Sequence, residues 1–194
     1  MNAIVIWAVA YLIGAIPCGV LIARSRKIDI REHGSGNIGA TNVARVIGKK
    51  EGALTLVGDC AKGTAAVALA THFLDSPFKV AVAALMAFLG HLFSIFLKFK
   101  GGKGVATGLG IFLYLMPLAA LSSMAVFAVV LGVSRYVSLG SILSAVSLPL
   151  FGIFYKMPPA FIYASAIVSA LAIVKHHENI RRLLAGAESK FGEK

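Results

Sequence analysis

The sequence predicts an all-α integral membrane protein, and three observations lead to this fold class. Apolar residues make up 58% of the 194 residues and charged residues only 14%, so a water-soluble fold would leave too much apolar surface exposed. The apolar residues gather in runs of near membrane-spanning length, and most lysines and arginines fall in the segments on one side of those runs. No polar block is large enough to fold alone, which indicates one membrane domain over residues 1–194.

Seven apolar segments follow one another along the chain. At about 1.5 Å per residue, most match a hydrocarbon core of roughly 30 Å. Segment 104–115 is the exception, because a helix of about 18 Å is too short to cross unaided and needs cover from other helices or a wet cavity. The expected segments are 2–24, 53–74, 78–98, 104–115, 117–134, 138–156 and 159–175.

The distribution of lysine and arginine favours one topology over its alternative. If 104–134 contains two elements broken at Pro117, nearly all the basic residues face the cytoplasm; if it is one span, the basic C-terminal tail moves outside. The positive-inside rule therefore favours seven helices, one of them short, with the N-terminus out and the C-terminus cytoplasmic. The net charge of +11 is then explained by membrane topology, and we expect no nucleic acid partner.

The first candidate site segment is the loop 34–45, which reads GSGNIGATNVAR. Its glycines leave backbone N–H groups accessible, and short polar side chains at Ser35, Asn37, Thr41 and Asn42 are suited to cap a helix running to about Gly48. Such a helix start binds anions, and Arg45 can add a forked, charged donor. An ordinary capped helix at the interface is the alternative interpretation.

The second segment is KFKGGKGVATGLG, residues 98–110. It lacks the spacing of an ATP-binding phosphate loop, but a tight turn that opens a helix directs unpaired N–H groups and one ammonium toward the same anion. We interpret Lys98 and Lys100 as membrane anchors and Lys103, with Gly102 and Gly104, as the functional group.

Two further polar segments face the same side in this topology. Ser138 and Ser141 open the sixth segment, where either can cap a helix or bind a ligand. The tail from 175 to 190 places Ile180, Leu183, Leu184 and Ala187 at helical spacing, which predicts an amphipathic helix on the membrane. Its remaining polar residues need an explanation beyond solvation; they are His177, Asn179 and Glu188.

Charged and titratable residues also occur inside the apolar segments. Asp59 and Lys62 lie three residues apart, where each charge costs roughly 2.5–3.5 kcal/mol on insertion scales. They are expected to pair inside the bundle, and a direct ligand role stays open. His91 either orients helices or lies near the site, while Cys18 and Cys60 are interpreted as inert buried thiols.

These segments favour phosphate chemistry without metal. The sequence has no zinc-binding cysteine pair, no HExxH, no acidic metal cluster and no His followed five residues later by Asp, the catalytic pair of the common lipid acyltransferases. An acyl donor used here must therefore already be activated.

The motifs SGNIGATNVAR, GGKGVAT, SLGS and HHENIRRLLAGAESK together resemble the bacterial acyl-phosphate-dependent glycerol-3-phosphate acyltransferases, in order and spacing over nearly the whole chain. The resemblance implies a seven-helix enzyme of phospholipid synthesis in the bacterial inner membrane. It would transfer an acyl group from acyl phosphate to the sn-1 hydroxyl of glycerol 3-phosphate, with its active site facing the cytoplasm. We expect a monomer with no cofactor and no covalent acyl-enzyme.

Residue roles follow from this resemblance and from the residue types. Lys103, the Gly102–Gly104 backbone, Ser141 and Asn179 are expected to hold the donor phosphate. Glycerol 3-phosphate is assigned to another set, Ser35, Asn37, Arg45 and His177, with Thr41 and Asn42 shaping the pocket and Glu188 as a further substrate-binding candidate. Either His177 or the donor's own phosphate takes the hydroxyl proton.

Two other classes of membrane protein would share some of these features. A transporter for an anionic solute would also use broken, glycine-rich helices, although the polar groups crowd one face and no inverted repeat is visible. A scaffold that binds anionic lipid would explain the basic loops but not the glycine spacing.

Overall fold

The structure is a computed structural model that describes residues 2–192, and all of its regular elements in this range are helices. They divide into two compact units, the first ending at Tyr114 and the second beginning at Leu115. The expected fold class is therefore confirmed as all-helical.

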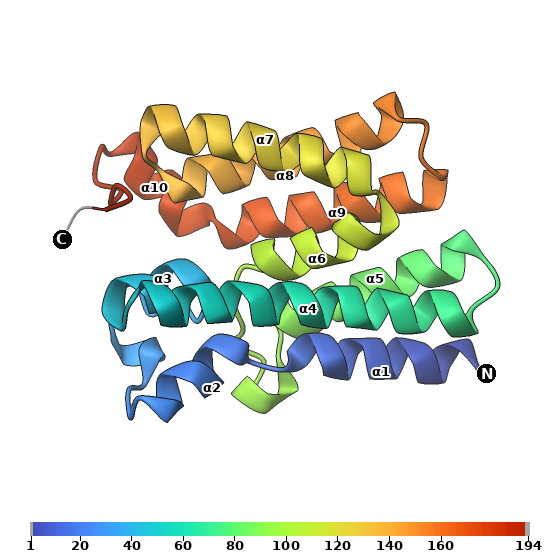
Figure 1. Ribbon diagram of the computed structural model, residues 1–194, viewed down its shortest axis with the longest axis horizontal. Helices are drawn as coiled ribbons and strands as arrows, with labels where there is room; N and C mark the ends of the chain where they lie inside the picture. Colours follow the sequence, from blue (N-terminus) through green and yellow to red (C-terminus); the bar gives the residue numbers. More distant parts are fainter. Residues whose placement is uncertain (1, 193–194) are drawn as a thin grey trace. The chain divides into compact units, whose positions relative to one another are not determined.

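In the first unit the helices α1 (Ala3–Ala15), α4 (Lys49–Phe73) and α5 (Pro77–Leu92) pack against one another (Figure 1). Shorter elements lie between and after these helices in the chain. These are α2 (Cys18–Ser25), the 3-10 helices η1 (Ile30–Glu32) and η2 (Ile95–Leu97), and α3 (Ala40–Val46).

The first apolar segment, predicted as one continuous helix over 2–24, is broken. Helix α1 ends before Ile16 and α2 begins at Cys18, because Pro17 has no N–H and its ring disfavours the helical conformation of the residue before it. The break leaves the Ile16 carbonyl outside the helical hydrogen-bond ladder. Lys62 uses this oxygen, as described below.

Helix α6 (Val105–Leu115) packs closely on α4 within the first unit. A Cβ at Gly63 would lie 2.3 Å from the Thr107 carbonyl oxygen, and one at Gly110 would lie 2.0 Å from the Cys60 carbonyl oxygen. The hydroxyl of Thr64 donates to the Gly110 carbonyl at 2.8 Å. Two glycines therefore permit the close backbone approach that holds this short helix.

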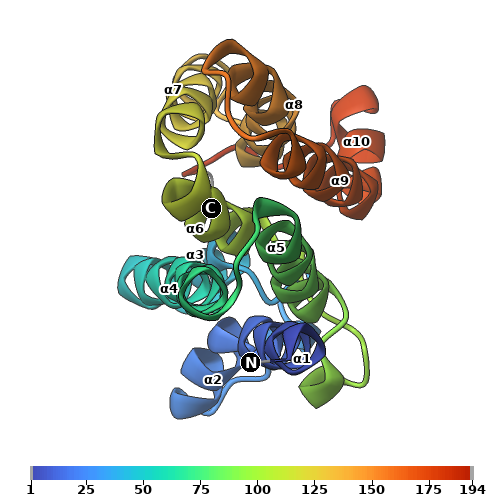
Figure 2. The same ribbon diagram turned by 90° about the vertical axis from the view of Figure 1, so that its right-hand side faces the viewer.

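The second unit contains α7 (Pro117–Ser134), α8 (Val137–Phe154), α9 (Pro159–Lys175) and α10 (His177–Leu184). Helix α8 packs against both α7 and α9 (Figure 2), and the Ser169 hydroxyl donates to the Ala145 carbonyl at 2.6 Å across the α8–α9 pair. Proline occupies the first position of α7 and α9, where its missing N–H costs nothing.

Within residues 2–192, five segments are long and apolar enough to cross a membrane, and the pair α9 and α10, bent by 58°, would be a sixth. Segment 104–115 is short, as expected. All seven predicted segments are therefore helical, whereas the number that cross and the direction of the termini stay predictions.

The tail helix is shorter than its apolar pattern predicts. It ends at Leu184, and Gly186 adopts φ +67°, so Ala187 turns back and donates its N–H to the Arg182 carbonyl at 2.8 Å. This is the backbone closure typical of a helix that ends at glycine. Ala187 is consequently outside the helix, and Leu184 is 85% exposed on the protein surface.

Candidate active site

The loop between η1 and α3, residues 33–39, is called the asparagine loop below. It is organised around the side chain of Asn42, which is 2% exposed. Its Oδ1 accepts the Ser35 N–H at 2.9 Å, and its Nδ2 lies 3.0 Å from the His33 carbonyl oxygen and 2.9 Å from that of Asn37. Gly34 adopts φ +61°, and a Cβ there would lie 2.3 Å from Asn42 Oδ1. The loop therefore closes onto one buried amide.

Helix capping by the loop's polar side chains is not what the structure shows. The N-cap of α3 is Gly39, which has no side chain, and its N–H donates to Asn37 Oδ1 at 2.9 Å. Asn42 lies inside α3 and stabilises the preceding loop. The cap prediction is wrong for both asparagines, because their side-chain amides bond to backbone groups of the loop.

Helix α3 presents two of the predicted residues to solvent. Thr41 and Arg45 are four residues apart, so they share a helix face, and both are exposed. Ser35 is also exposed, and Asn37 is half-buried. These residues are accessible to a soluble anion.

The loop entrance carries a local ion pair. Asp29 caps η1, with Oδ1 accepting the Arg31 backbone N–H at 3.1 Å and the Arg31 Nε at 2.9 Å. Hydrogen bonds from the Arg31 side chain hold the pKa of Asp29 well below its ordinary value. His33 Nδ1 contacts the Asp29 carbonyl oxygen at 2.8 Å, so the start of the loop is fixed on both sides of η1.

The turn over residues 101–104, which we call the glycine turn, follows η2 and is hydrogen-bonded to the end of α5. The N–H of Gly101 donates to the Leu92 carbonyl at 3.1 Å and that of Gly102 to the His91 carbonyl at 3.2 Å, which satisfies carbonyls left unpaired at the helix end. Gly104 adopts φ +83°. The Gly102 amide, expected to contact a phosphate, is thus engaged within the protein.

The glycine turn and the asparagine loop meet in the first unit. A Cβ at Gly102 would lie 3.2 Å from Ile38 Cγ1, and Ile38 belongs to a buried cluster with residues of α2, η1, α3 and η2. The apolar residue in the middle of the first motif therefore packs beside the second motif. Lys103, which follows Gly102, is half-buried.

In the second unit a buried carboxylate gathers three donors. Glu188 accepts from Ser138 Oγ at 2.6 Å, Asn179 Nδ2 at 2.6 Å and Arg182 Nε at 2.7 Å, and its side chain is 8% exposed. Burial raises the pKa of Glu188, but these hydrogen bonds outweigh it and hold the pKa below its ordinary value. The tail is thereby fastened to the starts of α8 and α10.

The serines of this unit do not cap α8, whose N-cap is Tyr136 without a side-chain cap. Ser138 donates to Glu188, as described above, and Ser141 is 5% exposed and donates to the Val137 carbonyl at 2.9 Å. His177 is exposed at the start of α10, with Nδ1 3.0 Å from the Val174 carbonyl oxygen.

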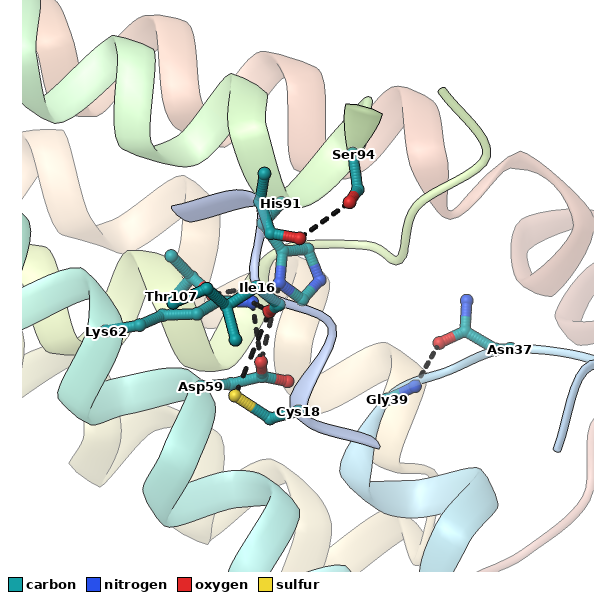
Figure 3. A network of polar contacts seen from close by, with 10 residues as sticks. Ile16, Cys18, Asn37, Gly39, Asp59, Lys62, His91, Ser94 and Thr107 are labelled. Carbon is teal, nitrogen blue, oxygen red and sulfur yellow. Dashed lines mark hydrogen bonds and ion pairs between the residues drawn. The ribbon is translucent and has the colours of Figure 1, made fainter. Parts of the chain in front are cut away.

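A buried polar cluster in the first unit joins Asp59, Lys62 and His91, whose roles have two alternatives each from the sequence (Figure 3). The expected Asp59–Lys62 pair is present, with Lys62 Nζ 2.7 Å from Asp59 Oδ1. His91 Nδ1 lies 3.0 Å from Thr107 Oγ1. Thr107 was missed by sequence reasoning, because its partner His91 is distant in the chain; only its place in the GGKGVAT motif pointed to it.

Comparison with known proteins gives consistent matches over the whole chain. Residues 4–186 match the family model described as glycerol-3-phosphate acyltransferase. A protein of that name from Trichlorobacter lovleyi is 52% identical over 98% of this chain and 99% of its own length. Its counterpart from Geobacter sulfurreducens is 48% identical, covering 98% of each chain.

Solved structures agree with these matches. The crystal structure of PlsY (YgiH), an integral membrane glycerol 3-phosphate acyltransferase, in its glycerol 3-phosphate form has a TM-score of 0.95 and 40% identity over 99% of this chain and 96% of its own. The lysophosphatidic acid form of PlsY gives a TM-score of 0.92 at the same identity and coverage.

Proposed function

The chain belongs to the glycerol-3-phosphate acyltransferase family, and from this premise we propose the reaction that it catalyses. It transfers a fatty acyl group from acyl phosphate to the sn-1 hydroxyl of glycerol 3-phosphate and releases lysophosphatidic acid and inorganic phosphate. The observation that carries the proposal is the likeness, at 40% identity over 99% of the chain, to a transferase crystallised in glycerol 3-phosphate and lysophosphatidic acid forms.

The chemistry of acyl phosphate suits a site made of cations and amides. The acceptor hydroxyl oxygen attacks the carbonyl carbon, a C–O ester bond forms, and the C–O bond to the phosphate breaks. The leaving phosphate keeps the bridging oxygen and its electron pair. Preorganised donors that stabilise this departing anion lower the barrier without a covalent intermediate, and holding both substrates together supplies the rest.

In the first unit, the exposed residues of the asparagine loop and α3 are assigned to the acceptor. Arg45 offers a forked donor to the phosphate of glycerol 3-phosphate, while Ser35 and Asn37 orient its hydroxyl groups. Thr41 shares the exposed face of Arg45 and shapes the pocket. Asn42 acts indirectly, because its buried side chain is used to fix the loop.

The donor phosphate is assigned to the glycine turn. Lys103 supplies the charge and Gly104 the close backbone approach, whereas Gly102 supports the turn through its bond to His91. In the second unit, Ser141 and Asn179 stay candidates for binding phosphate. Glu188 stays a substrate-binding candidate through Asn179, because Asn179 Nδ2 donates to its carboxylate at 2.6 Å.

There are two candidates for the group that accepts the proton of the attacking hydroxyl. His177 is exposed, and an imidazole accepts protons near neutral pH; the donor's own phosphate can equally take the proton. The variant His177→Ala separates them when both substrates are saturating. Near-normal kcat would exclude His177 as the base, whereas a loss of about a hundredfold would support it.

The setting proposed for this reaction is the cytoplasmic face of the bacterial inner membrane. The protein acts there as a monomer with no metal or other cofactor. This placement is supported by the clustering of basic residues in segments on one side of the apolar helices.

The test is a comparison of acyl donors with purified protein in detergent. Glycerol 3-phosphate is supplied with acyl phosphate, acyl coenzyme A or free fatty acid in turn, with a metal chelator present. We expect lysophosphatidic acid and an equal amount of inorganic phosphate from acyl phosphate alone, and NMR of the product should place the acyl group at sn-1. Comparable turnover with acyl coenzyme A would contradict the proposal.

A further inference from the structure

The side chains of the buried cluster in the first unit have no role in the reaction proposed above. Asp59, Lys62, His91 and Thr107 are each no more than 6% exposed. They come from three helices, α4, α5 and α6, and the cluster also contacts the break between α1 and α2 (Figure 3). A polar cluster at this position requires an explanation.

Stability alone is a weak explanation for the charged pair. Lys62 Nζ lies 2.7 Å from Asp59 Oδ1 and donates to the Ile16 carbonyl at 2.7 Å. Asp59 Oδ1 is ion-paired but receives no well-aligned hydrogen bond from the described residues. A buried ion pair of this kind adds little to stability compared with apolar packing, but it fixes the relative position of its partners.

His91 is the member of the cluster that meets the glycine turn. Its carbonyl accepts the Gly102 N–H at 3.2 Å, and its Nε2 would lie 2.5 Å from a Cβ at Gly102. On the other side of the ring, Nδ1 lies 3.0 Å from Thr107 Oγ1 and 3.7 Å from Asp59 Oδ1. The imidazole therefore packs directly against Gly102.

The two contacts of His91 bracket Lys103 in the sequence. Gly102 precedes Lys103 directly, and Thr107 follows four residues later in the first turn of α6. Because His91 holds the residues on both sides of Lys103, it limits the directions in which the Lys103 ammonium can point. His91 does this without touching the substrate. The carboxylate of Asp59, held by Lys62, lies beside the same ring nitrogen that meets Thr107.

We propose that His91 is the positioning residue of the donor-phosphate turn. The Asp59–Lys62 pair orients its imidazole, and the imidazole and the His91 carbonyl together fix Gly102 and Thr107 on either side of Lys103. This inference rests on the proposed function, since it assigns Lys103 to the phosphate of the acyl donor.

The test uses Thr107→Val, which keeps the shape of the side chain but removes the hydroxyl that meets His91. We expect the KM for acyl phosphate to rise about fivefold to tenfold, the loss of one hydrogen bond, with the KM for glycerol 3-phosphate unchanged. Thr107→Ser restores the hydroxyl and should restore the KM. His91→Ala should show the same selectivity with a larger change.

Ser94→Ala is the matched control at the same end of α5. The Ser94 hydroxyl is buried and donates to the Ala15 carbonyl at 2.6 Å, so its hydrogen bond goes to the end of α1 and not to the glycine turn. Its loss should lower the thermal unfolding temperature and leave both KM values unchanged. If Thr107→Val behaves like Ser94→Ala, the cluster is only structural and the positioning role is wrong.

A double variant tests the contact between His91 and the turn directly. Gly102→Ala places a methyl group against the imidazole, so adding His91→Ala should remove the clash and cost less than the product of the two single effects. Effects that multiply would overturn the inference. These outcomes apply only if the wild-type protein turns over acyl phosphate, so failure of the proposed function is seen separately in the wild type.

Discussion

Replacing Asn42 by alanine is expected to open the asparagine loop, which is assigned to glycerol 3-phosphate. The side-chain oxygen accepts one N–H, and the NH₂ group has two hydrogens to share among three nearby carbonyls. About three buried hydrogen bonds are therefore lost at once. At roughly 0.5–1.5 kcal/mol each, the closed loop loses about 3 kcal/mol, or about a hundredfold in the ratio of closed to open loop.

The assay is the initial rate against glycerol 3-phosphate concentration at saturating acyl phosphate. We expect the KM for glycerol 3-phosphate to rise at least tenfold, because the loop must be reordered before Ser35 and Asn37 can bind. Glu32→Gln is the control, since Glu32 is exposed in the neighbouring η1. Its KM should match that of the wild type.

Asn42→Asp distinguishes hydrogen bonding from shape. Aspartate has nearly the same size and keeps an acceptor for the Ser35 N–H, but it faces the carbonyl oxygens of His33 and Asn37 with a second oxygen. It should be at least as damaging as alanine. A KM within twofold of wild type for either variant would refute the reasoning.

Three other predictions concern the rest of the molecule. Arg45→Ala should raise the KM for glycerol 3-phosphate and spare that for acyl phosphate; an unchanged acceptor KM in kinetic assays would remove Arg45 from the acceptor site. Glu188 has a pKa below its ordinary value of 4.5, so its stabilising effect is present above that pH and is lost as the pH falls through the lowered pKa. The thermal unfolding temperature of Glu188→Gln should accordingly be lower than wild type at pH 7, with the difference shrinking in acid; a constant difference would contradict the assignment. Gly63→Ala should destabilise the protein in the same measurement, because its methyl group would lie 2.3 Å from the Thr107 carbonyl oxygen, and an unchanged unfolding temperature would contradict this packing.

The helical segments could be predicted from the sequence because membrane hydropathy is a local property. The segment predicted at 117–134 is observed as Pro117–Ser134 and that at 159–175 as Pro159–Lys175, since prolines mark their starts. The break at Pro17 was not foreseen, although proline was the available signal. Its consequence, the use of the Ile16 carbonyl by Lys62, depends on contacts far apart in the chain.

The candidate site shows the same division between local and distant information. Residue types and glycine spacing identified the motifs, but they did not identify which polar side chains face outward. Asn42 and Glu188 are used inside the protein, in networks made by residues up to 50 positions apart, and neither Ser138 nor Ser141 caps α8. The charges at 59 and 62 inside an apolar segment, together with His91 itself, were the local signals of this cluster.

The central claim is that acyl phosphate is the donor and that its carbonyl carbon is attacked. Acyl phosphate carrying ¹⁸O in the bridging position tests it directly, with mass spectrometry of the products formed by the purified protein with glycerol 3-phosphate. We predict that the label appears in inorganic phosphate and is absent from lysophosphatidic acid. Label recovered in lysophosphatidic acid, or no lysophosphatidic acid formed from this donor, would contradict the account.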